Sequence, residues 1–174
     1  MVNLVGDKVI LRALEPGDLD ILYNTENKID LWYVSDTVTP FSKHILKQYI
    51  DESHRDIYDA KQLRLAICLP DNAVIGFIDL FDFNAQHRRA GIGLVIVNEL
   101  NRSKGYAKDA LKVLINYSFS FLQLHQLYCD ITEDNNDSLN LFKSVGFNEI
   151  GVKKDWVYTN GTYKSVLMFQ IINA

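Results

Sequence analysis

The sequence is poor in the residues and segments that mark several protein classes. It has two cysteines and three prolines in 174 residues. No apolar run reaches the roughly 18 residues of a membrane span, so we expect no membrane partner. Cys68 and Cys129 each lie in an apolar, strand-like run without a second cysteine nearby, which predicts two buried, reduced thiols. Asp7 and Lys8 interrupt the N-terminus before any signal-peptide core, so we expect a cytoplasmic protein.

Motifs for dinucleotide, metal and acyl-enzyme chemistry are also missing. Gly91 and Gly93 begin a G-x-G-x-x-G pattern, but Ile96 occupies its third glycine position. There is no P-loop, no G-x-S-x-G elbow and no H-E-x-x-H, and the four histidines lack ligand spacing, so we expect no metal. The net charge of −4 argues against nucleic acid and favours a cationic partner.

The composition suits a single globular domain over residues 1–174, since 48% of the residues are apolar and 23% are charged. Strand and helix signals alternate without repeats, which predicts a mixed α/β or α+β sandwich. We expect strands at 9–12, 63–69, 73–83, 93–97 and 127–131, helices near 18–24, 42–58, 107–122 and 137–145, an irregular loop over 31–40, and a final hairpin about Asn160-Gly161.

The stretch "VIVNELNRSKGYAKDAL", from Val95 to Leu111, joins an apolar strand to an amphipathic helix through a short polar segment. The helix has one apolar stripe at three- and four-residue spacing: Ala107, Ala110, Leu111, Leu114, Ile115, Ser118, Phe119 and Leu122. A helix start has unpaired N–H groups and a positive dipole end, so Arg102 to Tyr106 are a candidate anion site. The alternative is that glycine and basic residues here only turn the chain and keep it soluble.

A second stretch, "NNDSLNLFKSVGF", runs from Asn135 to Phe147. We expect Asn135 to end a strand and Gly146 to cap the following helix. One face of that helix carries Ser138, Leu141, Phe142 and Val145. Taken alone, the pattern is typical of a packing helix.

The two stretches together, R-S-K-G-Y-A and N-x-x-S-x-x-L-F-x-x-x-G-F, resemble the Gcn5-related N-acetyltransferase (GNAT) family. The resemblance implies the GNAT acyl-CoA N-acyltransferase fold, with a mixed, mostly antiparallel sheet flanked by helices, and acetyl-CoA as cosubstrate. It also implies that the first motif holds the coenzyme A pyrophosphate and that the helix after the asparagine lies against the pantetheine and thiol. The implied coenzyme-binding residues are Arg102, Ser103, Lys104, Gly105, Tyr106, Ala107, Asn135, Ser138, Leu141 and Phe142. We expect the pantetheine amides to pair with the backbone of Val95, Ile96 and Val97 like an added strand.

The segments "ILRALEPGDLD", "GFIDLFDFNAQHRRAGIG", "LQLHQLYCDITEDN" and "YTNGTYKSVLMFQI" resemble the branch that contains spermidine acetyltransferases and ribosomal-protein N-terminal acetyltransferases. Three positions differ from the spermidine enzymes. Phe142 replaces a tyrosine proposed as the acid for the leaving thiolate, and Gly91 replaces a carboxylate. Asp36 is the one acid in a loop that is acid-rich in those enzymes.

Three functions remain open at this point. The resemblance implies acetyl transfer to a primary amine, either a small polyamine-like amine such as spermidine or a protein N-terminus. The third alternative is a coenzyme-A-binding module without turnover, in which Phe142 marks lost chemistry. We also expect a homo-oligomer, because the terminal hairpin offers strand edges that pair between subunits.

An attacking amine must first lose a proton, because an ammonium of pKa about 10 has no free lone pair. Along the strand expected at 73–83, two-residue alternation places Asp79 on the face of Ile75, Phe77, Phe81 and Phe83, with Asp82 on the other. A carboxylate on an apolar face is costly unless it is satisfied, so we expect Asp79 and Asp82 to attract the amine or act as base. Alternatively, Asp79 is a solvent-facing edge residue and Asp82 belongs to a turn.

Overall fold

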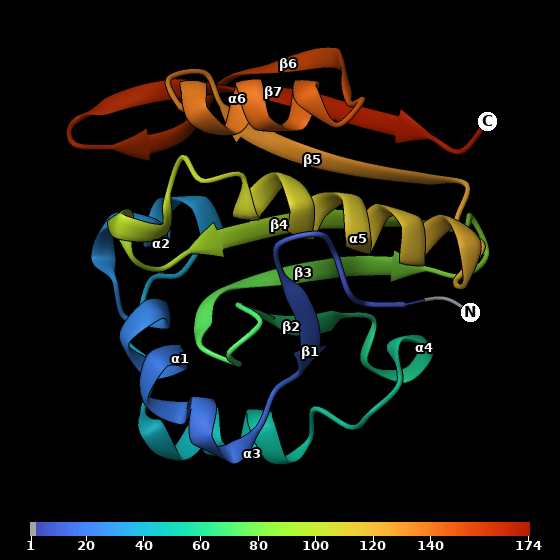
Figure 1. Cartoon of the computed structure of the whole chain (residues 1–174). Coiled ribbons are helices and arrows are strands. Elements are labelled where there is room, and N and C mark those ends of the chain that lie inside the picture. Colours follow the sequence, from blue (N-terminus) through green and yellow to red (C-terminus); the bar gives the residue numbers. More distant parts are fainter. Residues whose placement is uncertain (1–2) are drawn as a thin grey trace.

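A seven-stranded sheet organises residues 3–174, the range that this computed structural model describes; residues 1 and 2 of the expected domain lie outside it. The strands are β1 (Ile10–Ala13), β2 (Leu63–Cys68), β3 (Val74–Asn84), β4 (Arg89–Ile96), β5 (Gln126–Thr132), β6 (Asn148–Thr159) and β7 (Thr162–Ile172). Their order across the sheet is β1-β2-β3-β4-β5-β7-β6 (Figure 1). Neighbours are antiparallel except β4 and β5, which confirms the predicted mixed, mostly antiparallel GNAT-type sheet.

The helices occupy the two faces of this sheet. They are α1 (Leu19–Glu26), α2 (Ile29–Ser35), α3 (Lys43–Asp51), α4 (Ile57–Ala60), α5 (Tyr106–Ser120) and α6 (Asn136–Ser144), with 3₁₀ turns η1 (Pro16–Asp18) and η2 (Glu99–Asn101). The single helix expected over 42–58 is wrong, because the carboxylate of Asp56 caps a separate α4 by accepting the N–H groups of Tyr58 and Asp59. The loop expected to be irregular over 31–40 overlaps α2, and Asp36, directly after that helix, adopts the left-handed conformation.

The predicted hairpin about Asn160-Gly161 is present, and the strands expected at 63–69 and 73–83 form a second hairpin. Asn160 and Gly161, with φ of 50° and 78°, form the turn between β6 and β7. Between β2 and β3, the N–H of Leu69 donates to the carbonyl of Ala73 at 2.9 Å, and Asn72 adopts φ of 70°. Asparagine and glycine adopt positive φ more readily than other residues, which explains why they occupy these turn positions.

Two irregularities in β3 change which side chains share a face. Cys68 pairs with Val74 and Ile67 with Gly76, so Ile75 is an extra residue on β3. A second shift falls between Phe81 and Asn84. The strict alternation expected from 75 to 83 is therefore wrong at both ends of the strand. Asp79 shares its face with Phe77 and Phe81, whereas Ile75 and Phe83 belong to the core on the opposite face.

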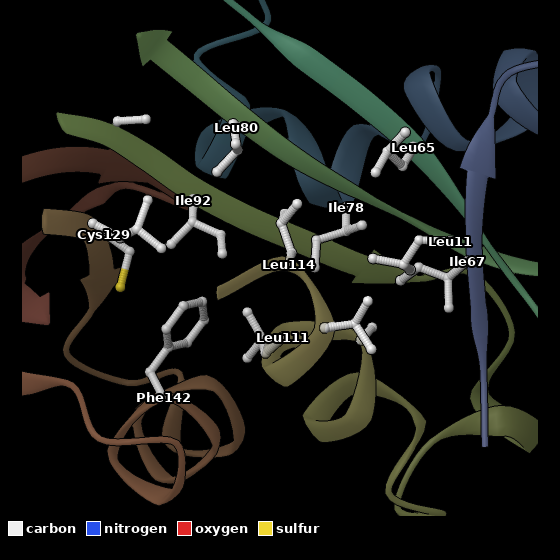
Figure 2. Close-up of a cluster of buried hydrophobic side chains, with 14 of the residues drawn as sticks. Leu11, Leu65, Ile67, Ile78, Leu80, Ile92, Leu111, Leu114, Cys129 and Phe142 are labelled. Carbon is white, nitrogen blue, oxygen red and sulfur yellow. The ribbon is translucent and has the colours of Figure 1, made fainter. Parts of the chain in front are cut away.

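Each face of the sheet has its own apolar core. One core packs α5 and α6 against the sheet, and Figure 2 shows Leu111 and Leu114 of α5 beside Ile78 of β3. The other packs α1 and α3 against β2 and β3. Cys129 is buried in the first core and Cys68 in the second, and both are free thiols, as predicted.

Candidate active site

β4 and β5 separate to leave an opening in the middle of the sheet, which we call the split. These two strands pair only at Arg89–Gln126, Ala90–Leu127 and Gly91–Tyr128. Beyond Gly91, β4 stays paired with β3 as far as Ile96, and β5 stays paired with β7 as far as Thr132. Each strand therefore has one edge facing the split, and Figure 1 shows the two strands diverging.

The edge of β4 offers hydrogen-bonding groups to the split. The N–H of Val97 donates to the carbonyl of Ile75 at 2.9 Å, so Val97 directs its backbone toward β3. Because antiparallel pairing alternates, Val95 does the same, and the N–H and C=O groups of Leu94 and Ile96 face the split. Of the predicted Val95, Ile96 and Val97, the structure leaves only Ile96 available to an added strand, and it adds Leu94, which the sequence analysis missed.

The start of α5 is a cradle of unpaired donors. Ser103 and Gly105 adopt positive φ of 58° and 83°. Within residues 3–174, no protein acceptor takes the backbone N–H groups from Ser103 to Lys108. The positive end of the α5 dipole adds to these donors, so the segment has the chemistry of a phosphate site. The side chains of Arg102 and Lys104 are exposed and contribute only solvent-screened charge.

A segment from the beginning of the chain supports this cradle. Asp109, buried in the first turn of α5, accepts the N–H groups of Asp7, Lys8 and Val9 at 3.2, 2.7 and 3.0 Å. The Nζ of Lys8 donates to the carbonyl of Lys104 at 2.9 Å. The sequence analysis did not assign this supporting role to Asp109 or Lys8. The one signal available was Asp109 itself, an acidic residue in the first turn of a predicted helix.

Asn135 does not end a strand, as was expected, because β5 stops at Thr132. Its Oδ1 instead accepts the N–H of Ser138 at 3.2 Å and caps α6. An unpaired N–H at a helix start needs such an acceptor, which explains asparagine at this position. Ser138 and Leu141 are half-buried, so the helix face expected to contact the coenzyme is only partly covered by the protein.

Phe142 is a core residue beneath the split. It is 4% exposed, and its ring meets Phe147 edge to face, with centroids 5.1 Å apart. Figure 2 shows the ring extending from α6 toward Ile92 of β4 and Cys129 of β5, the strands on either side of the split. The ring cannot donate a proton to a thiolate there.

Asp79 is in the interior of the sheet, paired with Arg64. Two hydrogen bonds, at 2.6 and 2.9 Å, join its carboxylate to the guanidinium, which also bonds to Glu26 of α1. Burial alone lowers the pKa of Arg64, but the two carboxylates outweigh it and raise that pKa above its ordinary value. Asp79 is therefore not a solvent-facing edge residue. The sequence analysis did not identify its partner Arg64 or the second carboxylate, Glu26.

Asp82 is exposed at the second irregularity of β3, with φ of 47°.

α2 lies across the open end of the split. Lys28, at its start, donates to the carbonyl of Val97 at 2.9 Å, and the Nζ of Lys164 on β7 lies 5.5 Å from the ring centroid of Tyr33. α2 therefore bridges the two sides of the opening.

Metal and membrane features are absent from the described part of the chain. No group of three or more histidine, cysteine or acidic side chains in residues 3–174 is placed to hold a metal ion. None of the helices in that range has the length and apolar character needed to cross a membrane.

Known proteins are similar to this chain in sequence and in fold. Residues 8–148 match the model of the acetyltransferase (GNAT) domain. Spermidine N(1)-acetyltransferase of Vibrio cholerae is 27% identical over 173 residues, covering 98% of this chain and 96% of that protein.

Solved structures agree. That of the Vibrio cholerae spermidine N-acetyltransferase in complex with CoA and spermine aligns with a TM-score of 0.84 at 27% identity, over 94% of this chain and 95% of that one. A dodecameric structure of the Vibrio cholerae enzyme in an intermediate state aligns with a TM-score of 0.76 at 26% identity, over 94% and 93%. The matched domain spans most of the chain, and this protein therefore belongs to the GNAT family of N-acetyltransferases.

Proposed function

We propose that this enzyme transfers the acetyl group of acetyl-CoA directly to a primary amine of a small polyamine such as spermidine, within a ternary complex. The observation that carries the proposal is the continuity between the split and the α5 cradle. Unpaired backbone groups of β4 lead toward the free N–H groups of Ser103 to Lys108. The relatives that act on spermidine or bind CoA and spermine support the same assignment.

The coenzyme fits the residues present. Its pyrophosphate would accept the N–H groups of the cradle, where Gly105 at φ of 83° lets the backbone approach closely. Its pantetheine amides would pair with Leu94 and Ile96 along the free edge of β4. An N–H on that edge would then polarise the thioester carbonyl as negative charge develops on its oxygen.

The acceptor would approach from the face that carries Asp79. Two carboxylates, Glu26 and Asp79, surround the single guanidinium of Arg64, so the cluster keeps a net negative charge that attracts a cationic amine. Because Arg64 engages both oxygens of Asp79, we assign this residue to amine attraction rather than direct proton abstraction. Asp82, exposed nearby on β3, would add to the attraction.

Thiolate departure would rely on water. A thiol has an ordinary pKa near 8.5, so the thiolate is a tolerable leaving group at neutral pH. Loss of a dedicated acid costs no more than roughly 10² to 10⁴ in rate. Phe142 thus reduces turnover without abolishing it.

We further propose a cytoplasmic homo-oligomer. The two free, buried thiols suit a reducing compartment. The β6–β7 hairpin forms one edge of the sheet and exposes the large apolar side chains of Ile150, Trp156, Tyr158 and Tyr163. Sedimentation velocity on the purified chain would test the assembly, and a monomer at micromolar concentration would contradict it.

The test of function is an amine panel assayed with acetyl-CoA, with release of free CoA and formation of acetylated amine both measured. We expect spermidine or spermine to give the highest kcat/KM and intersecting initial-velocity patterns, as a ternary complex requires. Coenzyme A binding by calorimetry without turnover of any amine would contradict the proposal and favour a binding module.

A further inference from the structure

Phe81 of β3 lies flat across the backbone of β4. A Cβ built on Gly91 would lie 2.2 to 2.7 Å from Cε2, Cζ and Cδ2 of the ring. A Cβ on Gly93 would lie 3.7 Å from Cε1, on the other edge of the same ring. The ring therefore covers β4 from one glycine to the next, and position 91 must be glycine for it to do so.

This ring lies where the split begins. Phe81 pairs across the sheet with Gly91, and Gly91–Tyr128 is the last pair before β4 and β5 separate. The rings of Phe81 and Tyr128 meet edge to face, with centroids 6.2 Å apart at 81°. Both residues are half-buried, so part of this aromatic surface is open to a ligand.

The ring is on the acceptor side of the sheet. The α5 cradle and α6 cover the face that contains Ile92, whereas Phe81 follows Phe77 and Asp79 on the opposite face. A thioester held in the split from the α5 side would meet an amine arriving over Phe81. Two of the nearby carboxylates are already bound: Asp79 to Arg64, and Asp130, after Tyr128 on the same face of β5, to Lys153 at 2.6 Å. Asp82, next to Phe81, is exposed, and burial together with the charge of Asp82 raises the pKa of Tyr128, so one carboxylate borders the rings.

We propose that Phe81, laid over Gly91 and flanked by Tyr128, is a specificity-determining residue that seats the apolar carbon chain next to the reacting nitrogen of the acceptor. This inference rests on the proposed function and adds to it the feature that selects among amine acceptors. An aromatic seat removes the methylenes next to the attacking nitrogen from water, which favours an apolar carbon chain at this position. The seat selects amines that carry several methylenes beside the nitrogen over short, polar amines of equal charge.

The experiment uses n-alkyl monoamines from propyl to hexyl, with ethanolamine as the polar reference. For the full-length wild type, kcat/KM should rise about fourfold for each methylene that the ring covers, the equivalent of about 0.8 kcal/mol per buried CH₂. In Phe81→Ala this dependence on chain length should flatten, while the Kd of acetyl-CoA stays within about twofold of the wild-type value. Phe121→Ala, at an exposed ring on the far end of α5 stacked on Tyr117, is the matched control and should keep the wild-type dependence.

Gly91 provides a second test. Gly91→Ala should force the ring away from β4 and lower kcat/KM for hexylamine more than for ethanolamine. The double variant Gly91→Ala with Phe81→Ala removes that clash, so its melting temperature should recover toward that of Phe81→Ala without recovery of the chain-length dependence. A ring that only stabilises the hairpin would lower the melting temperature and leave the dependence unchanged, which would overturn the proposal.

Binding measurements separate this inference from the proposed reaction. The Kd of the same amines for the enzyme–CoA complex, measured by calorimetry, reports the seat without turnover. Affinity that rises with chain length in wild type but not in Phe81→Ala, with no acetylation of any amine, would support the seat and contradict the proposed function. If the amines are acetylated but neither kcat/KM nor Kd depends on chain length, the proposed function would be supported and the seat contradicted.

Discussion

The two sides of the split present different chemical groups: backbone groups on one side and side chains on the other. On the α5 side, the candidate coenzyme groups are backbone N–H and C=O groups of β4 and of the cradle from Ser103 to Lys108. On the α1 and α3 side, the groups are side chains: the Glu26–Arg64–Asp79 cluster and the ring of Phe81. A backbone site requires few particular residues, whereas a side-chain site changes with each substitution.

The two sides also differ in what they require of the sequence. The coenzyme side needs one glycine in a left-handed conformation and a helix start, both of which the R-S-K-G-Y-A stretch supplies. On the acceptor side, glycine at 91 admits the ring of Phe81. We therefore expect substitutions to change the acceptor preference more readily than the binding of the coenzyme.

The largest expected effect is on the acceptor side. Arg64→Ala leaves Glu26 and Asp79 facing each other without a cation, and their side chains are only 18% and 27% exposed. We expect a loss of about 3 kcal/mol in the free energy of unfolding, since breaking a largely buried ion pair leaves uncompensated charge. Urea denaturation at pH 7 measures this loss.

Arg55→Ala is the matched control for that experiment. Arg55 also contacts two carboxylates, Glu52 and Asp59, but all three side chains are exposed. Its removal should change stability by less than about 1 kcal/mol. Equal losses for the two variants would show that the Arg64 cluster is not an unusually costly site.

The next effect is on the coenzyme side. Gly105→Val places a branched side chain at φ of 83° and brings its Cβ to 3.0 Å from Nζ of Lys8. We expect the Kd of acetyl-CoA to increase about tenfold or more, because the backbone can no longer approach the pyrophosphate closely. Isothermal titration calorimetry measures the Kd of acetyl-CoA for the variant and for the wild type.

Gly161→Val separates backbone strain from the site, because Gly161 also has positive φ, at 78°, but no atoms lie within 4 Å of an added Cβ. This control should lower the melting temperature and leave the Kd of acetyl-CoA unchanged. Unchanged affinity in a folded Gly105→Val variant would remove the cradle from the coenzyme site.

Phe142→Tyr tests the residue between the two sides. The ring is directed between β4 and β5, so a hydroxyl at its tip would add a proton donor beneath the split. We expect kcat to rise by up to about tenfold with little change in acetyl-CoA affinity. Steady-state kinetics and thermal melts check the variant together. A lowered melting temperature with no gain in kcat would mean that the hydroxyl is buried without a partner, at a cost of about 1 to 3 kcal/mol.

The smallest expected effect is that of Lys104→Ala. The side chain is exposed, and its backbone carbonyl, which accepts from Lys8, is retained in the variant. The Kd of acetyl-CoA should increase by no more than about fivefold, as for the loss of one exposed charge contact. A tenfold or larger increase at physiological ionic strength would show that the coenzyme is held by side-chain charge rather than by backbone donors.

Short-range patterns in the sequence predicted much of the fold. The α5 stripe, the Asn160-Gly161 turn and the hairpin between β2 and β3 are all encoded by neighbouring residues, and the structure has each of them. The split was not predicted, since the separation of β4 from β5 depends on pairing between distant segments of the chain.

Non-local features of the site escaped the sequence analysis. Pairing Asp79 with Arg64 requires the extra residue at Ile75, which shifts the register by one and which no local pattern announces. The contact of Asp109 with Lys8 joins segments about a hundred positions apart. α2 was missed because its apolar residues from Leu31 to Val34 are consecutive and so form no single stripe at helical spacing; none of them is buried.

The measurement that tests this account most directly is an amide NMR titration of the full-length chain, first with coenzyme A and then with spermidine. Coenzyme A should shift the amide resonances of Ser103 to Lys108 and of Leu94 and Ile96, while those of Phe81 and Asp79 respond mainly to the amine. Coenzyme A that leaves the Ser103–Lys108 amides unmoved while it shifts others at saturation would contradict the account.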